Sequence, residues 1–156
     1  MTVHMGARMS RILIIDDEPL VRAVLRSILE RQGHTVMEAP DGRAGLALWS
    51  HTPSDLVLTD MFMPEFDGIE VIRQLTRRWP QAKIIAMTGG AKIGDFTSSV
   101  APAALQLGAQ HMLLKPFTKR TLLTAISTVL NPQKESETKS LNRAADFSEA
   151  DCYETT

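Results

Sequence analysis

Short apolar runs that end in polar residues are the feature that most restricts how this chain of 156 residues can fold. The first run, ILII at residues 12–15, stops abruptly at Asp16 and Asp17. A continuous apolar run of this length is typical of a strand that is buried on both faces of a parallel sheet. We therefore expect a first strand at 11–16, and further strands at 34–38, 56–59, 83–87 and 110–114.

The segments between these runs have helical periodicity. Pro19 suits the first turn of a helix, and Gly33 suits its end. Between them, apolar residues recur every three or four positions, at Leu20, Val21, Val24, Leu25, Ile28 and Leu29. By the same reasoning, four more helices are expected at 41–50, 69–79, 103–107 and 118–130.

Strands that alternate with helices favour right-handed crossovers and a parallel sheet with helices on both faces. The predicted fold class is therefore α/β, a three-layer doubly wound sandwich around a five-stranded parallel sheet. We expect one domain at 10–131, an N-terminal extension at 1–9 and a polar, disordered tail at 132–156. The glycine-rich segment 89–100 resists assignment, and we expect it to be a mobile region before the fourth helix.

The composition of the chain restricts the cellular location of the protein and the kinds of partner it can bind. The formal net charge is −1, so no overall basic field points to direct nucleic-acid binding. No run approaches the roughly 20 apolar residues of a membrane span, and the first ten residues resemble no signal peptide. The single cysteine, Cys152, excludes a disulfide framework and fits a reducing compartment. A cytoplasmic location without membrane insertion is expected.

Polar residues stand at the carboxyl ends of four predicted strands. Asp16 and Asp17 follow the first, Asp60 ends the third, Thr88 ends the fourth and Lys115 follows the fifth. Open parallel sheets bind ligands at this edge. Three carboxylates there would repel one another without a cation, and an all-oxygen donor set favours Mg²⁺. With a lysine and a threonine, they form a cradle for a phosphoryl group with a carboxylate nucleophile.

These residues, in this order, resemble the receiver domain of two-component response regulators. The matching elements extend over 11–130 and are Asp16-Asp17, Asp60 with Met63-Pro64 and Asp67-Gly68, Thr88, and Lys115-Pro116-Phe117. The resemblance implies a stand-alone regulator similar to those of chemotaxis, with the flavodoxin-like strand order 2-1-3-4-5. It implies a signalling switch, not an enzyme.

The resemblance also implies roles for the site residues. Asp60 would accept a phosphoryl group from a histidine kinase or a histidine phosphotransfer protein. Mg²⁺, or Mn²⁺ in its place, would be bound by Asp17, Asp60 and the backbone carbonyl of Phe62, and by Asp16 through water. Lys115 would pair with the phosphoryl oxygens, and the Lys115–Pro116 peptide is expected to be cis.

Four positions bear on switching and on the lifetime of the phosphoryl group. Thr88 would move towards the phosphoryl group, and Met112 stands where many receivers have an aromatic switch residue. The fourth helix, fifth strand and fifth helix would then change their surface for an unidentified protein target, or phosphate would be relayed onwards. Phe62 and Gly90 cannot orient a water through their side chains, so we expect slow self-dephosphorylation.

Two other functions fit the same architecture less well. An aspartyl-nucleophile phosphatase would need an acid–base aspartate two residues after Asp60, where this chain has Phe62. A flavin-binding module would need a phosphate loop after the first strand, but Asp16-Asp17-Glu18-Pro19 would repel a phosphate unless a metal were bound.

Overall fold

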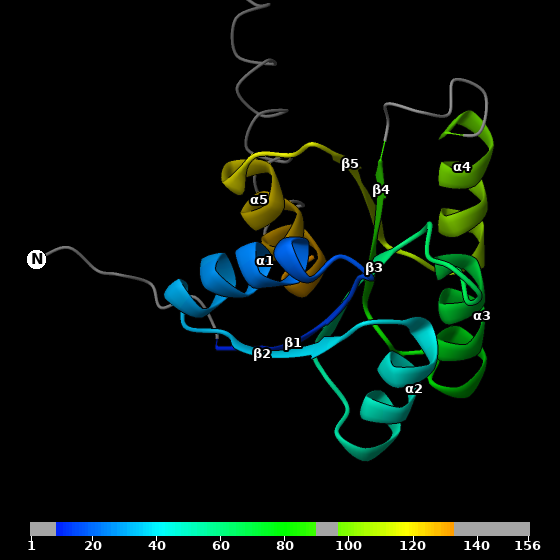
Figure 1. Cartoon of the computed structure of the whole chain (residues 1–156), viewed down its shortest axis with the longest axis horizontal. Coiled ribbons are helices and arrows are strands. Elements are labelled where there is room, and N and C mark those ends of the chain that lie inside the picture. Colours follow the sequence, from blue (N-terminus) through cyan, green and yellow to red (C-terminus); the bar gives the residue numbers. More distant parts are fainter. Residues whose placement is uncertain (1–8, 90–96, 133–156) are drawn as a thin grey trace, which may run out of the picture.

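The computed structural model describes residues 9–89 and 97–132, which alternate between strands and helices (Figure 1). The strands are β1 (Arg11–Ile15), β2 (Thr35–Ala39), β3 (Leu56–Asp60), β4 (Ile84–Gly89) and β5 (His111–Lys115). The helices are α1 (Pro19–Arg31), α2 (Gly42–His51), α3 (Gly68–Arg78), α4 (Thr97–Leu107) and α5 (Lys119–Leu130).

The five strands form one parallel sheet in the order β2-β1-β3-β4-β5, which confirms the predicted fold class and strand order. β1 lies between two neighbours, with Ile12 opposite both Val36 and Leu56. Since all strands run the same way, their carboxyl ends meet at one edge. The polar residues that follow the apolar runs are therefore brought together there.

Helices cover both faces of the sheet and bury two hydrophobic clusters. Leu13 and Ile15 point into the cluster beneath α2, α3 and α4, and Ile12 and Ile14 point into the cluster beneath α1 and α5. All four side chains are fully buried. The apolar run of β1 is continuous because both of its faces are covered.

The fourth helix is longer than its sequence pattern predicts. We expected helix only at 103–107, but α4 begins at Thr97, so the interpretation of 97–100 as unassigned loop is wrong. Pro102 lies inside the helix and removes one main-chain hydrogen bond, so propensity alone disfavours a helix that crosses it. The rest of the expected mobile segment, residues 90–96, lies outside the described residues.

The predicted terminal segments lie almost entirely outside the described residues, which include only Met9 of the extension and Pro132 of the tail. The boundaries proposed for the domain therefore remain predictions. Within 9–89 and 97–132, no helix is long and apolar enough to cross a membrane.

Candidate functional site

Three carboxylates meet at the carboxyl edge of the sheet. Asp16 and Asp17 follow β1, and Asp60 is the last residue of β3. Each offers an oxygen that lies within 4.8 Å of the others. Asp16 is fully buried and Asp60 is 5% exposed. Like charges held this close repel one another unless a cation neutralises them.

Lys115 supplies one cation. It is the last residue of β5, two strands away from β3, and its Nζ donates to Asp16 Oδ2 over 2.8 Å. The same nitrogen lies 3.6 Å from Asp60 Oδ2. The peptide that joins Lys115 to Pro116 is cis. A single ammonium thus contacts two of the three carboxylates, which leaves the cluster with excess negative charge.

Hydrogen bonds fix Asp16 on several sides. Its backbone N–H donates to the carbonyl of Ala39 over 3.2 Å, and its Oδ1 accepts from the backbone N–H of Glu18 over 2.9 Å. Glu18 is the N-cap residue of α1, but its own side chain makes no capping bond. The buried carboxylate of Asp16 therefore helps to hold the turn that leads from β1 into α1.

The surroundings of Asp60 raise its pKa above the ordinary value for an aspartate. Burial is the largest cause, and the charges of Asp16 and Asp17 act in the same direction. The charge of Lys115 and a hydrogen bond from the backbone of Phe62 oppose them. A second cation at the cluster would favour the ionised, nucleophilic form of Asp60.

Lys115 remains protonated at neutral pH. Burial by itself lowers the pKa of its ammonium, but the hydrogen bond to Asp16 and the charges of Asp60, Asp16 and Glu18 together outweigh burial. Its pKa is therefore raised, and the group acts as a fixed positive charge.

The loop from β3 to α3 is packed tightly on the end of β3. Asp60 Oδ1 accepts from the N–H of Phe62 over 3.3 Å, and the N–H of Gly68 donates to the carbonyl of Met61 over 3.1 Å. A Cβ at position 68 would lie 2.3 Å from the carbonyl oxygen of Asp60. Gly68 is needed because the first turn of α3 approaches the backbone of β3 this closely.

Thr88, on the neighbouring strand β4, carries a hydroxyl without a fixed partner. The residue is fully buried, and its Oγ1 makes no hydrogen bond within the described part of the chain. A buried hydroxyl in this state costs free energy, which an acceptor group near it would recover. Met112 of β5 is partly buried against the cluster beneath α2, α3 and α4.

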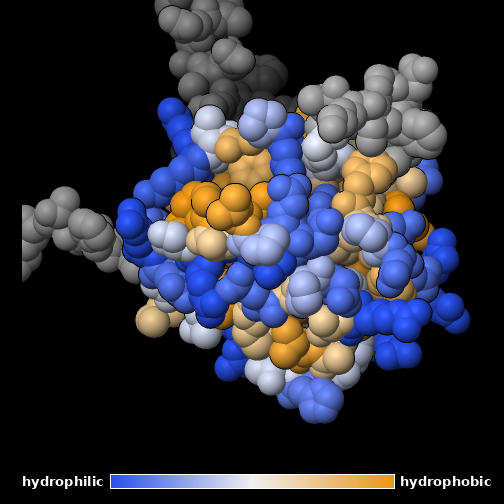
Figure 2. All heavy atoms as spheres, viewed as in Figure 1, coloured by the Kyte–Doolittle hydropathy of each residue, from blue (hydrophilic) through white to orange (hydrophobic). Residues whose placement is uncertain are grey.

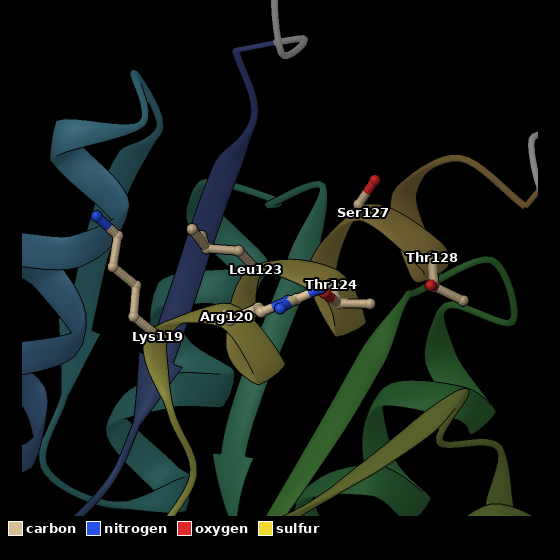
Figure 3. A pocket seen from close by; sticks show the side chains of 6 residues that line it. All are labelled: Lys119, Arg120, Leu123, Thr124, Ser127 and Thr128. Atoms are coloured by element: carbon tan, nitrogen blue, oxygen red, sulfur yellow. The ribbon is translucent and has the colours of Figure 1, made fainter.

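A separate open pocket lies along the outer face of α5 (Figure 3). It is lined by Lys119, Arg120, Leu123, Thr124, Ser127 and Thr128. None of the clustered carboxylates contributes to it. The clustered carboxylates lie at the carboxyl edge of the sheet, outside this pocket.

Comparison with known proteins decides the family. Residues 12–127 match the family model described as the response regulator receiver domain. The chain belongs to this family. Receiver domains are signalling switches that accept phosphate from kinases, and the fold and the acidic edge described above agree with that assignment.

Several relatives support the assignment of this receiver domain. It is 37% identical to the protein PilH of Pseudomonas aeruginosa over 78% of this chain and 98% of PilH. A CheY-like receiver structure from Methanospirillum hungatei has a TM-score of 0.72 at 31% identity and covers 82% of this chain and 98% of its own. A probable transcriptional regulator, ycf27 of Galdieria sulphuraria, is 37% identical over 79% of this chain, which spans only 46% of that longer protein.

One contact of the receiver site was missed by sequence reasoning. Arg22 of α1 donates from Nη1 to the backbone carbonyl of Asp16 over 2.7 Å. In the sequence, Arg22 is only a charged residue on the polar side of a helix. The available signal was its position six residues after Asp16, because residues in the first turns of α1 lie close to the end of β1.

Proposed function

We propose that this receiver domain accepts a phosphoryl group on Asp60 in a reaction that requires Mg²⁺. The supporting observation is the position of Asp60, 5% exposed, beside two carboxylates and 3.6 Å from the Lys115 ammonium. A carboxylate oxygen of Asp60 attacks phosphorus, an acyl phosphate forms and the donor leaves with the bonding electrons. Lys115 neutralises charge on the transferred oxygens.

The residues at this edge fit a magnesium ion. The donor set is made of carboxylate oxygens, as a hard cation requires, and the cluster carries more negative charge than Lys115 neutralises. Asp17, Asp60 and the backbone carbonyl of Phe62 would hold the ion, with Asp16 acting through water; Mn²⁺ would fit the same set. The ion would supply electrostatic stabilisation to the phosphoryl group.

Phosphorylation at Asp60 would change a surface elsewhere in the domain. The hydroxyl of Thr88 has no hydrogen-bond partner among residues 9–89 and 97–132, so it is a donor that the phosphoryl group can recruit, and Met112 lies in the next strand where it can repack. The surface to which an unidentified target protein binds would be formed by α4, β5 and α5. Leu105 of α4 and Leu114 of β5 are 47% and 57% exposed, which suits a binding surface.

The phosphodonor would be a histidine kinase or a histidine phosphotransfer protein in the cytoplasm. Apolar side chains are exposed where Figure 2 shows the surface of α1 and α5. Leu20 and Val24 of α1 are 80% and 58% exposed. They lie one helical turn apart on the helix that begins beside the acidic edge, so they give a donor protein an apolar surface to pack on.

Replacing Leu20 with aspartate is expected to slow phosphoryl transfer from a cognate protein donor by about ten-fold, the effect of losing about 1.4 kcal/mol of binding. The reaction with acetyl phosphate should be unchanged, because that donor needs no docking surface. Leu114→Asp, on the proposed output surface, is the matched control and should leave both reactions as in the wild type. Equal rates for Leu20→Asp and the wild type with the protein donor would contradict docking on α1.

Self-dephosphorylation should be slow. Phe62 is 38% exposed two residues after Asp60 and cannot hydrogen-bond an attacking water through its side chain. We expect Phe62→Asn to speed decay of the phosphorylated protein several-fold, as measured by the loss of phosphoryl mass over time. Phe62→Leu, which lacks a hydrogen-bonding group, should decay as slowly as the wild type. Equal decay of the asparagine and leucine variants would show that water positioning at this residue does not limit the rate. Gly90, the second residue implicated, lies outside the described residues.

The function is tested by incubating the full chain with acetyl phosphate and Mg²⁺ and measuring its intact mass. We expect the mass of one phosphoryl group to be added, with no addition when EDTA removes the metal. Addition that persists in EDTA would contradict a metal-dependent reaction. No addition with either acetyl phosphate or a panel of histidine kinases would contradict phosphoacceptance itself.

A further inference from the structure

Arg22 makes a contact that the proposed reaction does not yet explain. Its Nη1 donates to the backbone carbonyl of Asp16 over 2.7 Å, and its side chain is only 17% exposed. A charged donor that is largely shielded from water makes a stronger hydrogen bond than an exposed one, because water competes less for it. The carbonyl of Asp16 is therefore held in a fixed direction by α1.

This carbonyl belongs to the peptide unit that joins Asp16 to Asp17. Because a peptide unit is planar, fixing the direction of its carbonyl also fixes the N–H of Asp17 and limits the rotation that sets where the Asp17 side chain points. The other side of Asp16 is already held by Lys115 and by the N–H of Glu18. Arg22 thus holds the peptide unit that joins Asp16 to Asp17.

Glu38 of β2 orients Arg22 in turn. The Arg22 Nε lies 3.5 Å from Glu38 Oε1, and Glu38 is 23% exposed. Arg26, one turn further along α1, also pairs with Glu38 and with Glu30, but its side chain is 44% exposed and its main-chain contact is with Val36. Two arginines of one helix therefore share a glutamate, but Arg22 bonds to the main chain of the acidic turn and Arg26 to the main chain of β2.

We propose that Arg22 is a positioning residue for the metal site, and that it raises Mg²⁺ affinity by fixing the peptide between Asp16 and Asp17. The inference rests on the proposed function, since it assigns Asp17 to the metal. Groups that orient metal ligands without touching the metal commonly change affinity ten-fold or more when removed. The ligand is Mg²⁺, and the guanidinium itself does not bind it.

The test is a Mg²⁺ titration of the full chain followed by backbone amide chemical shifts, which suits a weak ion site. Arg22→Ala is expected to bind Mg²⁺ about ten-fold more weakly than the wild type. Arg26→Ala is the matched control, because it removes a partner of the same Glu38 from the same helix, and it should bind within about two-fold of the wild type. Melting of the metal-free proteins identifies a temperature at which every variant is folded.

Arg22→Lys separates the hydrogen bond from other effects of the substitution. Only one Arg22 nitrogen reaches the Asp16 carbonyl, and a lysine ammonium can make one such bond, so this variant should recover part of the lost affinity. Arg22→Ala binding as tightly as the wild type would overturn the inference, as would an equal loss in Arg26→Ala or no recovery in Arg22→Lys. Absence of Mg²⁺ binding by the wild type would instead contradict the proposed function.

Discussion

Asp60→Asn is expected to accept no phosphoryl group from acetyl phosphate and Mg²⁺, while it folds as well as the wild type. An amide is not a nucleophile under these conditions, and no other described carboxylate combines the strand-end position with the lysine and threonine neighbours. The fold should tolerate the change, because asparagine is nearly isosteric and because it removes one of three carboxylates that lie within 4.8 Å. Lys115 keeps its 2.8 Å hydrogen bond to Asp16.

Intact mass after incubation with acetyl phosphate, together with a thermal melt, measures both effects. Asp55→Asn is the control, since Asp55 lies in the turn before β3 and accepts from the backbone N–H of Arg11, far from the acidic edge. It removes the same charge and should be labelled as fully as the wild type. Labelling of Asp60→Asn to the level of Asp55→Asn would show that the acceptor has been misassigned.

Gly68→Ala should cause the largest loss of stability among single-methyl changes near the site. The added Cβ would lie 2.3 Å from the Asp60 carbonyl oxygen and 2.7 Å from the Met61 Cα, and backbone atoms cannot move aside as a flexible side chain can. We expect the free energy of unfolding to fall by about 2–3 kcal/mol, as in overpacked cores. Displacement of the Asp60 backbone should also slow phosphorylation.

Gly89→Ala provides the comparison for that variant. Gly89 also ends a strand at the same edge, but a Cβ there would meet nothing within 4 Å. Its free energy of unfolding should stay within about 0.5 kcal/mol of the wild type in a denaturant titration. Similar midpoints for the two alanine variants would mean that the contact between α3 and β3 is looser than the 2.3 Å approach at Gly68 indicates.

The sheet and its acidic edge could be predicted because their signals are local. The apolar run of β1 predicts a buried strand without any knowledge of its neighbouring strands. Asp16 directly follows the end of β1, and Asp60 is the last residue of β3. Parallel pairing then brings these residues together whatever the exact helix positions are. The strand order came from the family resemblance, since no local pattern encodes which strands are neighbours.

Other features could not be read from the sequence, because they depend on tertiary contacts. The first turns of α4 were missed since Pro102 disfavours helix locally, and packing against α3 and β5 compensates for that preference. The pairing of Arg22 with Glu38 could not be predicted because Glu38 lies in β2, which is placed beside the end of β1 only when these two strands pair. Likewise, the lack of a partner for the Thr88 hydroxyl among the described residues follows from the packing of the site and not from the local sequence.

The position of the phosphoryl group in the wild-type chain tests the central claim most directly. Borohydride reduces an aspartyl phosphate to homoserine, so reduction after incubation with acetyl phosphate and Mg²⁺ marks the acceptor permanently, and peptide mass spectrometry locates it. We predict homoserine at position 60 alone, and none when EDTA is present. Homoserine at position 16 or 17, or a phosphoryl group retained on a histidine, would contradict the assignment of Asp60 as the acceptor.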